Sequence, residues 1–457
     1  MKFGKVKKLH FVGIGGIGMC GIAEVLHNQG YVITGSDLSM TEVTDHLTKI
    51  GIKVVQGHVA ENIDEADCVV ISSAVHADNP EVNEAKRRKI PVIRRAEMLG
   101  ELMRLKFGIG VAGTHGKTTT TSILGHLLVE AGMDPTVMVG GRVISLGTTV
   151  KLGKGDLLVA EADEYDRSFL NLTPSMAVLT TIEEDHLDYY KDLAEIMAAF
   201  TQFANKVPFY GAIHLNLDDS NVVSLIPDLI RPVRTFGIKS QADTRADNII
   251  ADGTATNFDL YYHDYRLGHI HLPLPGVFNV KNALAAISVA LEFDIPFETI
   301  KKALESFKGV NRRFDLIGEQ NGIKVYDDYA HHPTEIDVTL RAAKVAFKSR
   351  VIVVFQPHLF SRTRDFYREF AKSLLMCDML ILAKLYPARE APIAGVTSQM
   401  ISDAAAQFGH KNVRYIEDIT RIPSAIAEYA QPGDVVFTIG AGDIYRTAPK
   451  ILEALKK

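Results

Sequence analysis

The feature that most constrains the fold is a short apolar stretch that runs directly into a glycine-rich loop and then a helical pattern. It occurs twice in the 457 residues. The first copy leads from residues 9–12 into the loop 13–18, and the second from residues 107–112 into the loop 113–119. Strands that alternate with helices form βαβ units, so we predict an α/β fold with mostly parallel sheets.

Strand candidates fall into three groups along the chain. They lie at residues 9–13, 32–34, 53–55 and 68–72, then at 107–112, 157–160, 177–180 and 212–216, and finally at 324–326, 351–355, 379–383 and 435–439. A chain of this length corresponds to about three domains of roughly 150 residues each. We therefore expect linkers between the groups, near residues 105–106 and 309–311.

Composition and charge argue against several classes of protein. Hydrophobic residues make up 47%, charged residues make up 23%, and the formal net charge is −5. Neither a disordered chain nor a general nucleic-acid-binding surface is expected from these values. The cysteines Cys20, Cys68 and Cys377 form no CxxC pair, which argues against a disulfide framework or a cysteine-ligated zinc. No apolar run spans a bilayer and the first residues do not resemble a signal peptide, so we expect a soluble cytoplasmic protein.

The first loop matches the pattern G-x-G-x-x-G between a strand and an amphipathic helix at residues 19–27. Glycines let backbone N–H groups and the helix N-terminus approach a diphosphate, and Asp37 after the next strand is placed for a ribose hydroxyl. Alone, this pattern indicates an NAD-dependent oxidoreductase, or simply a tight turn that packs a helix on a sheet. The candidate residues of this site are Gly13, Gly15, Gly16, Ile17, Gly18, Asp37 and Ser72.

The second loop resembles a P-loop, in which backbone N–H groups surround phosphates. Lys117 would contact the β- and γ-phosphates and Thr118 would bind Mg²⁺. The strict motif has glycine where this chain has Val111, and the alternative is that Lys117 is an ordinary surface lysine. The candidate ATP-binding residues are Gly113, Thr114, His115, Gly116, Lys117, Thr118 and Thr119. Two phosphate-type loops favour an enzyme that uses ATP to join a nucleotide-linked substrate to a second molecule.

Acidic residues follow two strands of the second group. Residues 161–166 read Glu-Ala-Asp-Glu-Tyr-Asp, and residues 183–188 read Glu-Glu-Asp-His-Leu-Asp. Carboxylates at the ends of parallel strands near a phosphate loop are placed for Mg²⁺, which prefers oxygen ligands. Histidine is an unusual Mg²⁺ ligand, and the alternative is a pair of solvated acidic loops.

Several motifs, taken together and in order, resemble the muramyl ligase family, the ATP-dependent amide-bond-forming enzymes of peptidoglycan synthesis. Besides the second loop they are the strings at residues 161–164 (EADE), 185–188 (DHLD), 279–286 (NVKNALAA), 312–314 (RRF), 327–335 (DDYAHHPTE), 355–358 (FQPH) and 440–443 (GAGD). The resemblance covers essentially the whole chain. The opening loop and the 185–188 string are similar to the branch of the family that adds alanine.

The resemblance implies a UDP-sugar-binding Rossmann-like domain at 1–106, an ATP- and Mg²⁺-binding central domain at 107–311, and a Rossmann-like domain at 312–457 that closes on ATP and the amino acid. It also implies that L-alanine is joined to the lactyl carboxylate of UDP-N-acetylmuramate through an acyl phosphate. The first loop then binds UDP rather than NAD. The implied partners are ATP with Mg²⁺ or Mn²⁺ and the two substrates, without nucleic acid or a membrane span, in a monomer or homodimer.

The resemblance also assigns roles to single residues. The implied metal ligands are Thr118, Glu161 and His186. Asn279 and Asn282 would lie near the adenine and phosphates, although Asn279 could instead cap the helical run 283–291. The implied contacts of the closing domain are Arg313 and Asp328 to ATP, with Tyr329, His331, His332, Arg362 and Arg364 facing the carboxylate and the alanine. The catalytic candidates are Lys117, His331 and Arg362. For His332 a purely structural role is the alternative, whereas the imidazole of His331 is suited to accept the proton of the alanine ammonium.

Two departures from the family's pattern stand out. Ligases that add later residues carry a lysine, modified to a carbamate, after the metal histidine, whereas residues 198–201 read Ala-Ala-Phe-Thr here. We therefore expect the alanine-adding branch and no carbamylated lysine. The family's Pro-His-Arg string reads Pro357-His358-Leu359 here. Either Arg362 or Arg364 supplies the missing basic contact, or the contact is dispensable.

Three other functions stay open on the sequence. One is a ligase of the same family that returns a whole peptide to UDP-N-acetylmuramate. Another is a non-catalytic UDP-sugar sensor, against which the intact Gly116-Lys117-Thr118 argues. The third is the NAD-dependent oxidoreductase, which rests on the first loop alone. Assays with alanine, a peptide and NADH distinguish them.

Overall fold

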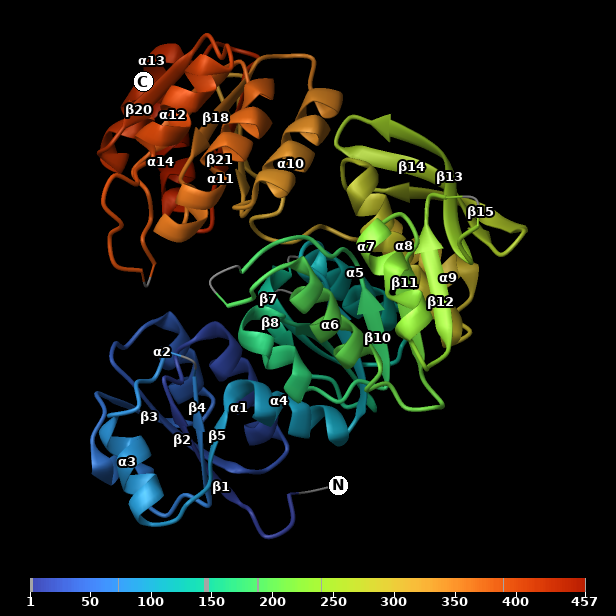
Figure 1. The fold of residues 1–457 in the computed structure, drawn as a ribbon, viewed down its shortest axis with the longest axis vertical. Helices are drawn as coiled ribbons and strands as arrows, with labels where there is room; N and C mark the ends of the chain where they lie inside the picture. Colours follow the sequence, from blue (N-terminus) through green and yellow to red (C-terminus); the bar gives the residue numbers. More distant parts are fainter. Residues whose placement is uncertain are drawn as a thin grey trace. The chain divides into compact units, whose positions relative to one another are not determined.

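The computed structural model describes residues 3–72, 74–143, 148–186, 189–239, 241–388 and 390–456, and the side chains of Ile17, 141–143 and 148–149 lie outside this description. The chain separates into two compact units. The first contains residues 1–245 and 282–300, and the second contains residues 246–281 and 301–457. Figure 1 labels many of the elements of both units.

The first sheet belongs to the first unit and is entirely parallel. Its strands are β1 (Lys8–Val12), β2 (Val32–Asp37), β3 (Lys53–Gln56), β4 (Cys68–Ile71) and β5 (Val92–Arg94), in the order β3-β2-β1-β4-β5. Apolar residues of α1 (Ile17–Asn28), α2 (Glu42–Lys49) and α4 (Arg95–Arg104) cover one face, and η1 (Ala60–Ile63) and α3 (Pro80–Arg87) cover the other. The strand order reverses at β1 and β4, and ligands of such sheets bind beyond the carboxyl ends of the strands at this point.

The second sheet also lies in the first unit. Its strands run in the order β12-β11-β10-β6-β9-β7-β8, all parallel except the β7–β8 hairpin. They are β6 (Phe107–Ala112), β7 (Thr136–Val143), β8 (Thr148–Lys151), β9 (Leu157–Ala162), β10 (Met176–Leu179), β11 (Ala212–Asn216) and β12 (Val233–Gly237). The helices of this region are α5 (Lys117–Glu130), η2 (Tyr165–Asn171), α6 (Leu193–Ala204), α7 (Ser220–Ser224), η3 (Ile226–Asp228) and α8 (Val277–Glu292) from residue 282 onward. Residues 119–128 of α5 are buried, so the helix after the second loop is enclosed on all sides.

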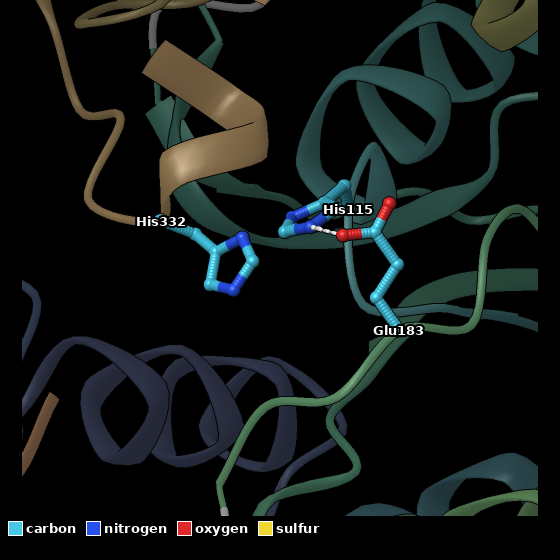
Figure 2. A group of neighbouring side chains, drawn as sticks. All are labelled: His115, Glu183 and His332. Carbon is cyan, nitrogen blue, oxygen red and sulfur yellow. Dashed lines mark hydrogen bonds and ion pairs between the residues drawn. The ribbon is translucent and has the colours of Figure 1, made fainter. Parts of the chain in front are cut away.

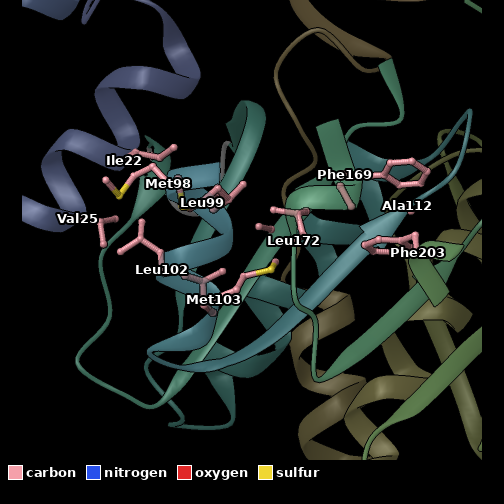
Figure 3. Packing of buried hydrophobic residues seen from close by; sticks show 14 of the residues in the cluster. Ile22, Val25, Met98, Leu99, Leu102, Met103, Ala112, Phe169, Leu172 and Phe203 are labelled. Atoms are coloured by element: carbon pink, nitrogen blue, oxygen red, sulfur yellow. The ribbon is translucent and has the colours of Figure 1, made fainter. Parts of the chain in front are cut away.

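A continuous apolar core joins the two sheets of the first unit. In Figure 3, Met98 and Leu102 of α4 lie beside Ile22 and Val25 of α1, and Met103 points toward Leu172. Backbones also approach closely, because a Cβ on Gly100 would stand 2.3 Å from the carbonyl oxygen of Asn171. Such packing leaves no room for a side chain at that position.

The second unit contains an antiparallel hairpin and the third sheet. The hairpin strands are β14 (Ala255–Tyr262) and β15 (Tyr265–Leu272), preceded by β13 (Thr244–Asp252), and α9 (Phe297–Glu305) ends in this unit. The third sheet has the order β16-β17-β21-β18-β19-β20, and only β16 is antiparallel to its neighbour. Its strands are β16 (Asp315–Gln320), β17 (Ile323–Asp328), β18 (Val351–Phe355), β19 (Met379–Ala383), β20 (Val413–Ile416) and β21 (Val435–Ile439).

Helices cover both faces of the third sheet, as the orange and red part of Figure 1 shows. Apolar side chains of α10 (Pro333–Ala346), α11 (Phe360–Ser373) and α12 (Gln399–Gln407) pack on one face, and those of α13 (Ile422–Tyr429) and α14 (Thr447–Ala454) pack on the other. Short 3₁₀ turns complete the layers at η4 (Leu374–Met376), η5 (Ile419–Arg421) and η6 (Ile444–Arg446). Successive residues of β18 enter opposite cores, which explains why 351–355 is an unbroken apolar run.

The α/β fold predicted from the sequence is confirmed, and each predicted strand overlaps an observed one. The strands that were not predicted from the sequence are β5, β7, β8, β12, β13, the hairpin β14–β15, the edge strand β16 and β20. In the part of the chain that the structure describes, no helix is long and apolar enough to cross a membrane.

Candidate active site

The first glycine loop leaves β1 at its carboxyl end. Gly13 has a φ of +77°, a left-handed conformation that glycine adopts without steric cost. The N–H groups of Gly13 and Ile14 donate to the carbonyl oxygen of Ser36 at 2.8 and 3.0 Å. A Cβ on Gly13 would stand 3.1 Å from Oγ of Ser72, so Ser72, directly after β4, lines the same loop.

Asp37 contacts the loop itself. Its Oδ2 accepts the N–H of Gly15 at 2.8 Å, and its Oδ1 accepts the N–H of Ser39 at 3.3 Å. A Cβ on Gly15 would lie 2.9 Å from Asp37 Oδ2. The acid predicted for a ribose hydroxyl is therefore held against the N–H group that a diphosphate would use.

The N-terminus of α1 adds further donors to this site. Gly16 is the N-cap residue and no side chain caps the helix, so its first N–H groups have no intrahelical acceptor. A Cβ on Gly18 would stand 2.8 Å from Nη1 of Arg95, which brings a cation beside the loop. The sequence did not single out Arg95. Among the predicted residues, the side chain of Ile17 lies outside the described part of the structure.

A buried polar network supports the first loop from behind. Ser36, whose carbonyl accepts the loop N–H groups, donates its hydroxyl to Glu81 Oε2 at 2.7 Å, and both side chains are fully buried. Burial acts to raise the pKa of Glu81, but hydrogen bonds from His10, Ser36 and Asn62 outweigh it and the pKa is lowered. The sequence showed no signal for this network, because its members are scattered over two strands and two helices.

The second loop contains two glycines at which any other residue would displace neighbouring atoms. Gly116 is the N-cap of α5 with a φ of +84°, and a Cβ there would lie 2.5 Å from Asn282 Oδ1. Gly113 has a φ of +141°, and its Cβ would lie 2.0 Å from Thr180 Oγ1. Asn282 also accepts the hydroxyl of Thr120 at 3.3 Å, which places its side chain beside the first turn of α5.

Backbone contacts tie this loop to the segment that follows β10. Thr114 donates its N–H to the carbonyl of Thr181 at 2.8 Å, and Glu183 donates its N–H to Thr114 Oγ1 at 2.9 Å. Figure 2 shows the ring of His115, whose Nε2 lies 3.3 Å from Glu183 Oε2. The loop is thereby held at its base by the neighbouring parallel strand.

Lys117 forms an ion pair inside the protein and is not a surface lysine. Its Nζ donates to both carboxylate oxygens of Glu164, at 2.9 and 2.8 Å, and to the carbonyl of Gly113 at 2.6 Å. The side chains are 16% and 4% exposed. Burial acts to lower the pKa of Lys117, but the nearby carboxylates, first of all Glu164, outweigh it and raise the pKa. Burial raises the pKa of Glu164, and we treat the pair as ionised because one ammonium donates to both oxygens.

The carboxylates at the end of β9 (Leu157–Ala162) and directly after it form two groups. Glu161 accepts the N–H of Gly140 on β7 at 2.7 Å. Candidate metal-binding atoms of Asp163, Glu164 and His186 all lie within 4.8 Å of one another. Glu164 is buried, which argues against the hypothesis of a purely solvated loop. His186 has a φ of +54° and an edge-on contact with the ring of Tyr165. The neighbouring Leu187 and Asp188 of the predicted string lie outside the described residues.

The donor set of this region fits a hard cation. Among the candidate ligands carboxylate oxygens predominate, Thr118 on the first turn of α5 would add a hydroxyl, and His186 is the one nitrogen ligand. Mg²⁺ prefers such oxygen ligands. The sequence named Glu161 as the metal carboxylate, whereas the structure brings Asp163 and Glu164 next to His186. The position of Glu164 three residues after Glu161 was the available signal.

The helix that carries both predicted asparagines begins earlier than the sequence suggested. α8 starts at Val277, so Asn279 lies inside its first turn and not before it. Its Nδ2 donates to the carbonyl of Pro275 at 2.8 Å. The alternative hypothesis that Asn279 is the N-cap of this helix is therefore wrong.

In the second unit, Asp328 is the last residue of β17, and its side chain binds backbone groups of two neighbouring segments. Its carboxylate accepts the N–H groups of Phe314 and Ala330, each at 2.8 Å. Burial raises its pKa to about 6, against the opposing effect of Arg313. Arg313 Nη1 lies 3.6 Å from Glu335 Oε1, and its guanidinium faces the ring of Tyr329.

The predicted histidines occupy different local positions. His331 Nδ1 lies 3.0 Å from the carbonyl of Tyr329, and the backbone N–H of His331 donates to Glu335 Oε2 at 2.9 Å. His332 is the N-cap of α10, where its Nδ1 faces the N–H of Thr334 at 3.4 Å. This contact supports the structural alternative for His332.

The two arginines of α11 also differ. Arg362 is buried, whereas Arg364 is exposed and pairs with Asp365 at 2.7 Å. Just before them, Leu359 takes a φ of +72°, a strained conformation for a branched residue. The strain lies where the family's pattern has arginine.

Comparisons with known proteins agree over the whole chain. Residues 8–107 match the Mur ligase family catalytic domain, residues 111–290 match the Mur ligase middle domain, and residues 312–442 match the Mur ligase glutamate ligase domain. A UDP-N-acetylmuramate–L-alanine ligase of Salinibacter ruber is 54% identical over 455 residues, which cover 99% of this chain and 96% of the relative. The ligase of the same name from Geobacter sp. is 51% identical and covers 99% of both chains.

Solved structures show the same likeness. The crystal structure of a UDP-N-acetylmuramate–alanine ligase from Thermotoga maritima superposes with a TM-score of 0.83 at 30% identity and covers 98% of this chain and 99% of that chain. A murein peptide ligase from Psychrobacter arcticus gives a TM-score of 0.72 at 25% identity and covers 99% of both chains.

Proposed function

The chain belongs to the Mur ligase family, whose members are ATP-dependent, and from that premise we propose that it joins L-alanine to UDP-N-acetylmuramate. The products would be UDP-N-acetylmuramoyl-L-alanine, ADP and phosphate, a step of peptidoglycan precursor synthesis. The observation that carries the proposal is the pair of glycine loops in one folded unit, each of which ends a parallel strand and opens a helix. Full-length relatives with this activity in their names support it.

ATP would make the carboxylate reactive. An unactivated carboxylate does not acylate an amine in water at useful rates, whereas an acyl phosphate carries a good leaving group. Backbone N–H groups of the second loop and the ammonium of Lys117 would bind the phosphates and offset the charge of the transferred group. The neutral amine of alanine would then attack, and the tetrahedral intermediate would collapse to amide and phosphate.

Mg²⁺ belongs to the proposal as well. Thr118, Glu161 and His186 would hold it, and Asp163 and Glu164 offer further carboxylate oxygens close to His186. When bound, the cation would offset the repulsion between these carboxylates and the triphosphate.

The remaining roles extend the proposal to the whole chain. Domain boundaries at residues 106/107 and 311/312 would separate UDP-sugar, ATP and closing domains. Arg313 and Asp328 would contact ATP, and Asn279 would lie near the adenine. Tyr329, His331 and Arg362 would face the carboxylate and the alanine, with His331 as a candidate for the proton acceptor. We place the enzyme in the cytoplasm, as a monomer or homodimer.

Phosphate release tests the proposal. Purified protein is incubated with ATP, Mg²⁺ and UDP-N-acetylmuramate, and separately with L-alanine, glycine, L-serine or the tripeptide of the recycling ligases. Release that depends on L-alanine and on the UDP-sugar is the expected result. Release with the tripeptide but not with L-alanine would instead assign the recycling activity. Binding of NADH without binding of the UDP-sugar would favour the oxidoreductase hypothesis.

A further inference from the structure

The acceptors of the protein itself use the whole hydrogen-bonding capacity of Lys117. An ammonium has three protons, and Nζ has four acceptors within reach: both oxygens of Glu164, the carbonyl of Gly113 at 2.6 Å and the carbonyl of Thr114 at 3.3 Å. A phosphate oxygen can bond to this ammonium only if one of these acceptors gives way.

The carboxylate of Glu164 is negatively charged, which is unfavourable beside a triphosphate. It is 4% exposed, so water screens it poorly. If it stayed on Lys117, it would neutralise the one side-chain cation of the loop and repel the incoming phosphates. Two anionic groups would then compete for the same ammonium.

The position of Glu164 is set by its surroundings. The hydroxyl of Tyr190 donates to the backbone carbonyl of Glu164 at 2.6 Å, and both residues are buried. The backbone is thus anchored while the side chain reaches the lysine. Its neighbour Asp163 is exposed and accepts the N–H of Tyr165 at 3.2 Å.

We propose that Glu164 is an internal counter-ion that occupies Lys117 in the nucleotide-free protein and is displaced from it by the phosphates of ATP. The inference rests on the proposed role of Lys117 in the ATP site. Glu164 is a positioning residue in this scheme, because it acts through Lys117 and keeps a buried ammonium paired until the nucleotide arrives. ATP then binds against its competition, so the wild-type affinity is lower than the loop alone would provide.

The sign of the change in affinity tests this proposal. Glu164→Gln keeps the size of the side chain and removes its charge, so calorimetry with a non-hydrolysable ATP analogue, in the absence of Mg²⁺, should show roughly tenfold tighter binding. The same variant without nucleotide should melt at a lower temperature, because Lys117 loses its partner. A residue with a merely structural role would weaken both properties, and equal or weaker binding overturns the proposal.

Asp163→Asn is the matched control. It removes the same charge from the same loop, but its carboxylate is exposed and makes no hydrogen bond to Lys117. In calorimetry without Mg²⁺, where a role at the cation has no effect, a change of about twofold or less is expected. A tightening equal to that of Glu164→Gln would mean that only the net charge of the loop matters, and would overturn the assignment to Glu164.

A structure of the wild-type protein with the analogue keeps the test decisive if Glu164→Gln does not fold. The distance from Lys117 Nζ to the nearer Glu164 oxygen should exceed hydrogen-bonding range, and an intact pair overturns the proposal. Alanine-dependent phosphate release by the wild type, together with an intact pair, would refute this inference alone. Absence of any analogue binding by the wild type would refute the proposed function as well.

Discussion

The two glycine loops share a construction and differ in how they would hold a phosphate. Each follows a parallel strand, contains a glycine with positive φ, and opens a helix whose N-cap is glycine. In each loop, a carboxylate of the chain accepts a hydrogen bond from a group that could otherwise bind phosphate. Asp37 accepts the N–H of Gly15, and Glu164 accepts the ammonium of Lys117. The first loop offers backbone donors, whereas the second adds a side-chain cation within it.

This difference matches the two tasks that we propose. The diphosphate of UDP is bound but not chemically changed during the reaction, so fixed backbone donors are sufficient to bind it. A transferred phosphoryl group changes its charge distribution and position, and a lysine on a flexible stem can follow it. The supports differ in the same sense, because the first loop rests on the buried Ser36–Glu81 pair and the second on backbone contacts to the segment after β10.

Lys117→Ala should have the largest effect. Loss of the ammonium should lower kcat by about 10³-fold, because a preorganised donor to the transferred phosphoryl group is gone. Binding of UDP-N-acetylmuramate to the first loop should stay within about twofold of the wild type. Steady-state kinetics and calorimetry check both numbers, and an equal loss of UDP-sugar affinity would break the division between the loops.

Gly15→Val perturbs the first loop and leaves the second loop intact. A branched side chain would collide with Asp37 Oδ2, 2.9 Å from the new Cβ, and with Thr44 Cγ2 at 3.1 Å. We expect UDP-sugar affinity to fall by about 2–3 kcal/mol, the order of overpacking costs. ATP-analogue affinity should be unchanged. Calorimetry with each ligand separates the outcomes, and a parallel loss of analogue binding would contradict independent loops.

We expect the Mg²⁺ requirement to depend on the second loop and its neighbouring ligands and not on the first loop. Glu161→Ala and His186→Ala should each raise the Mg²⁺ concentration for half-maximal activity about tenfold, as expected when one ligand of a cation is removed. The UDP-sugar affinity measured without Mg²⁺ should not change. A Mg²⁺ titration that superposes on the wild type for both variants would favour Asp163 and Glu164 as the metal carboxylates.

Asp37→Ala should have the smallest effect. Loss of a hydrogen bond to the ribose weakens UDP-sugar binding, but the N–H of Gly15 becomes free for the diphosphate. The two changes oppose each other, so we expect a net loss of only about 1 kcal/mol. Asp37→Asn is the matched control, because its amide oxygen can still accept that N–H. Tighter binding by the alanine variant would mean that Asp37, like Glu164, acts mainly as a counter-ion.

Much of the site could be predicted because its signals are local. Glycine at positions 13, 113 and 116 reflects backbone conformations and close approaches that act within a few residues of the loop. The strands could be predicted because a parallel strand buried on both faces is an apolar run. Where a signal was weak, as at the start of α8, the predicted element began six residues late.

The sequence by itself therefore determined the α/β fold, the two loops and the helices that they open, since short-range sterics and hydrophobic periodicity encode them. Only the tertiary structure decided which charges meet. Glu164 lies 47 residues after Lys117, and Glu81 lies 45 residues after Ser36. Such pairs form because parallel strands bring the ends of distant segments to one edge of a sheet, and burial then makes their charges interact strongly. No pattern along the chain carries that information.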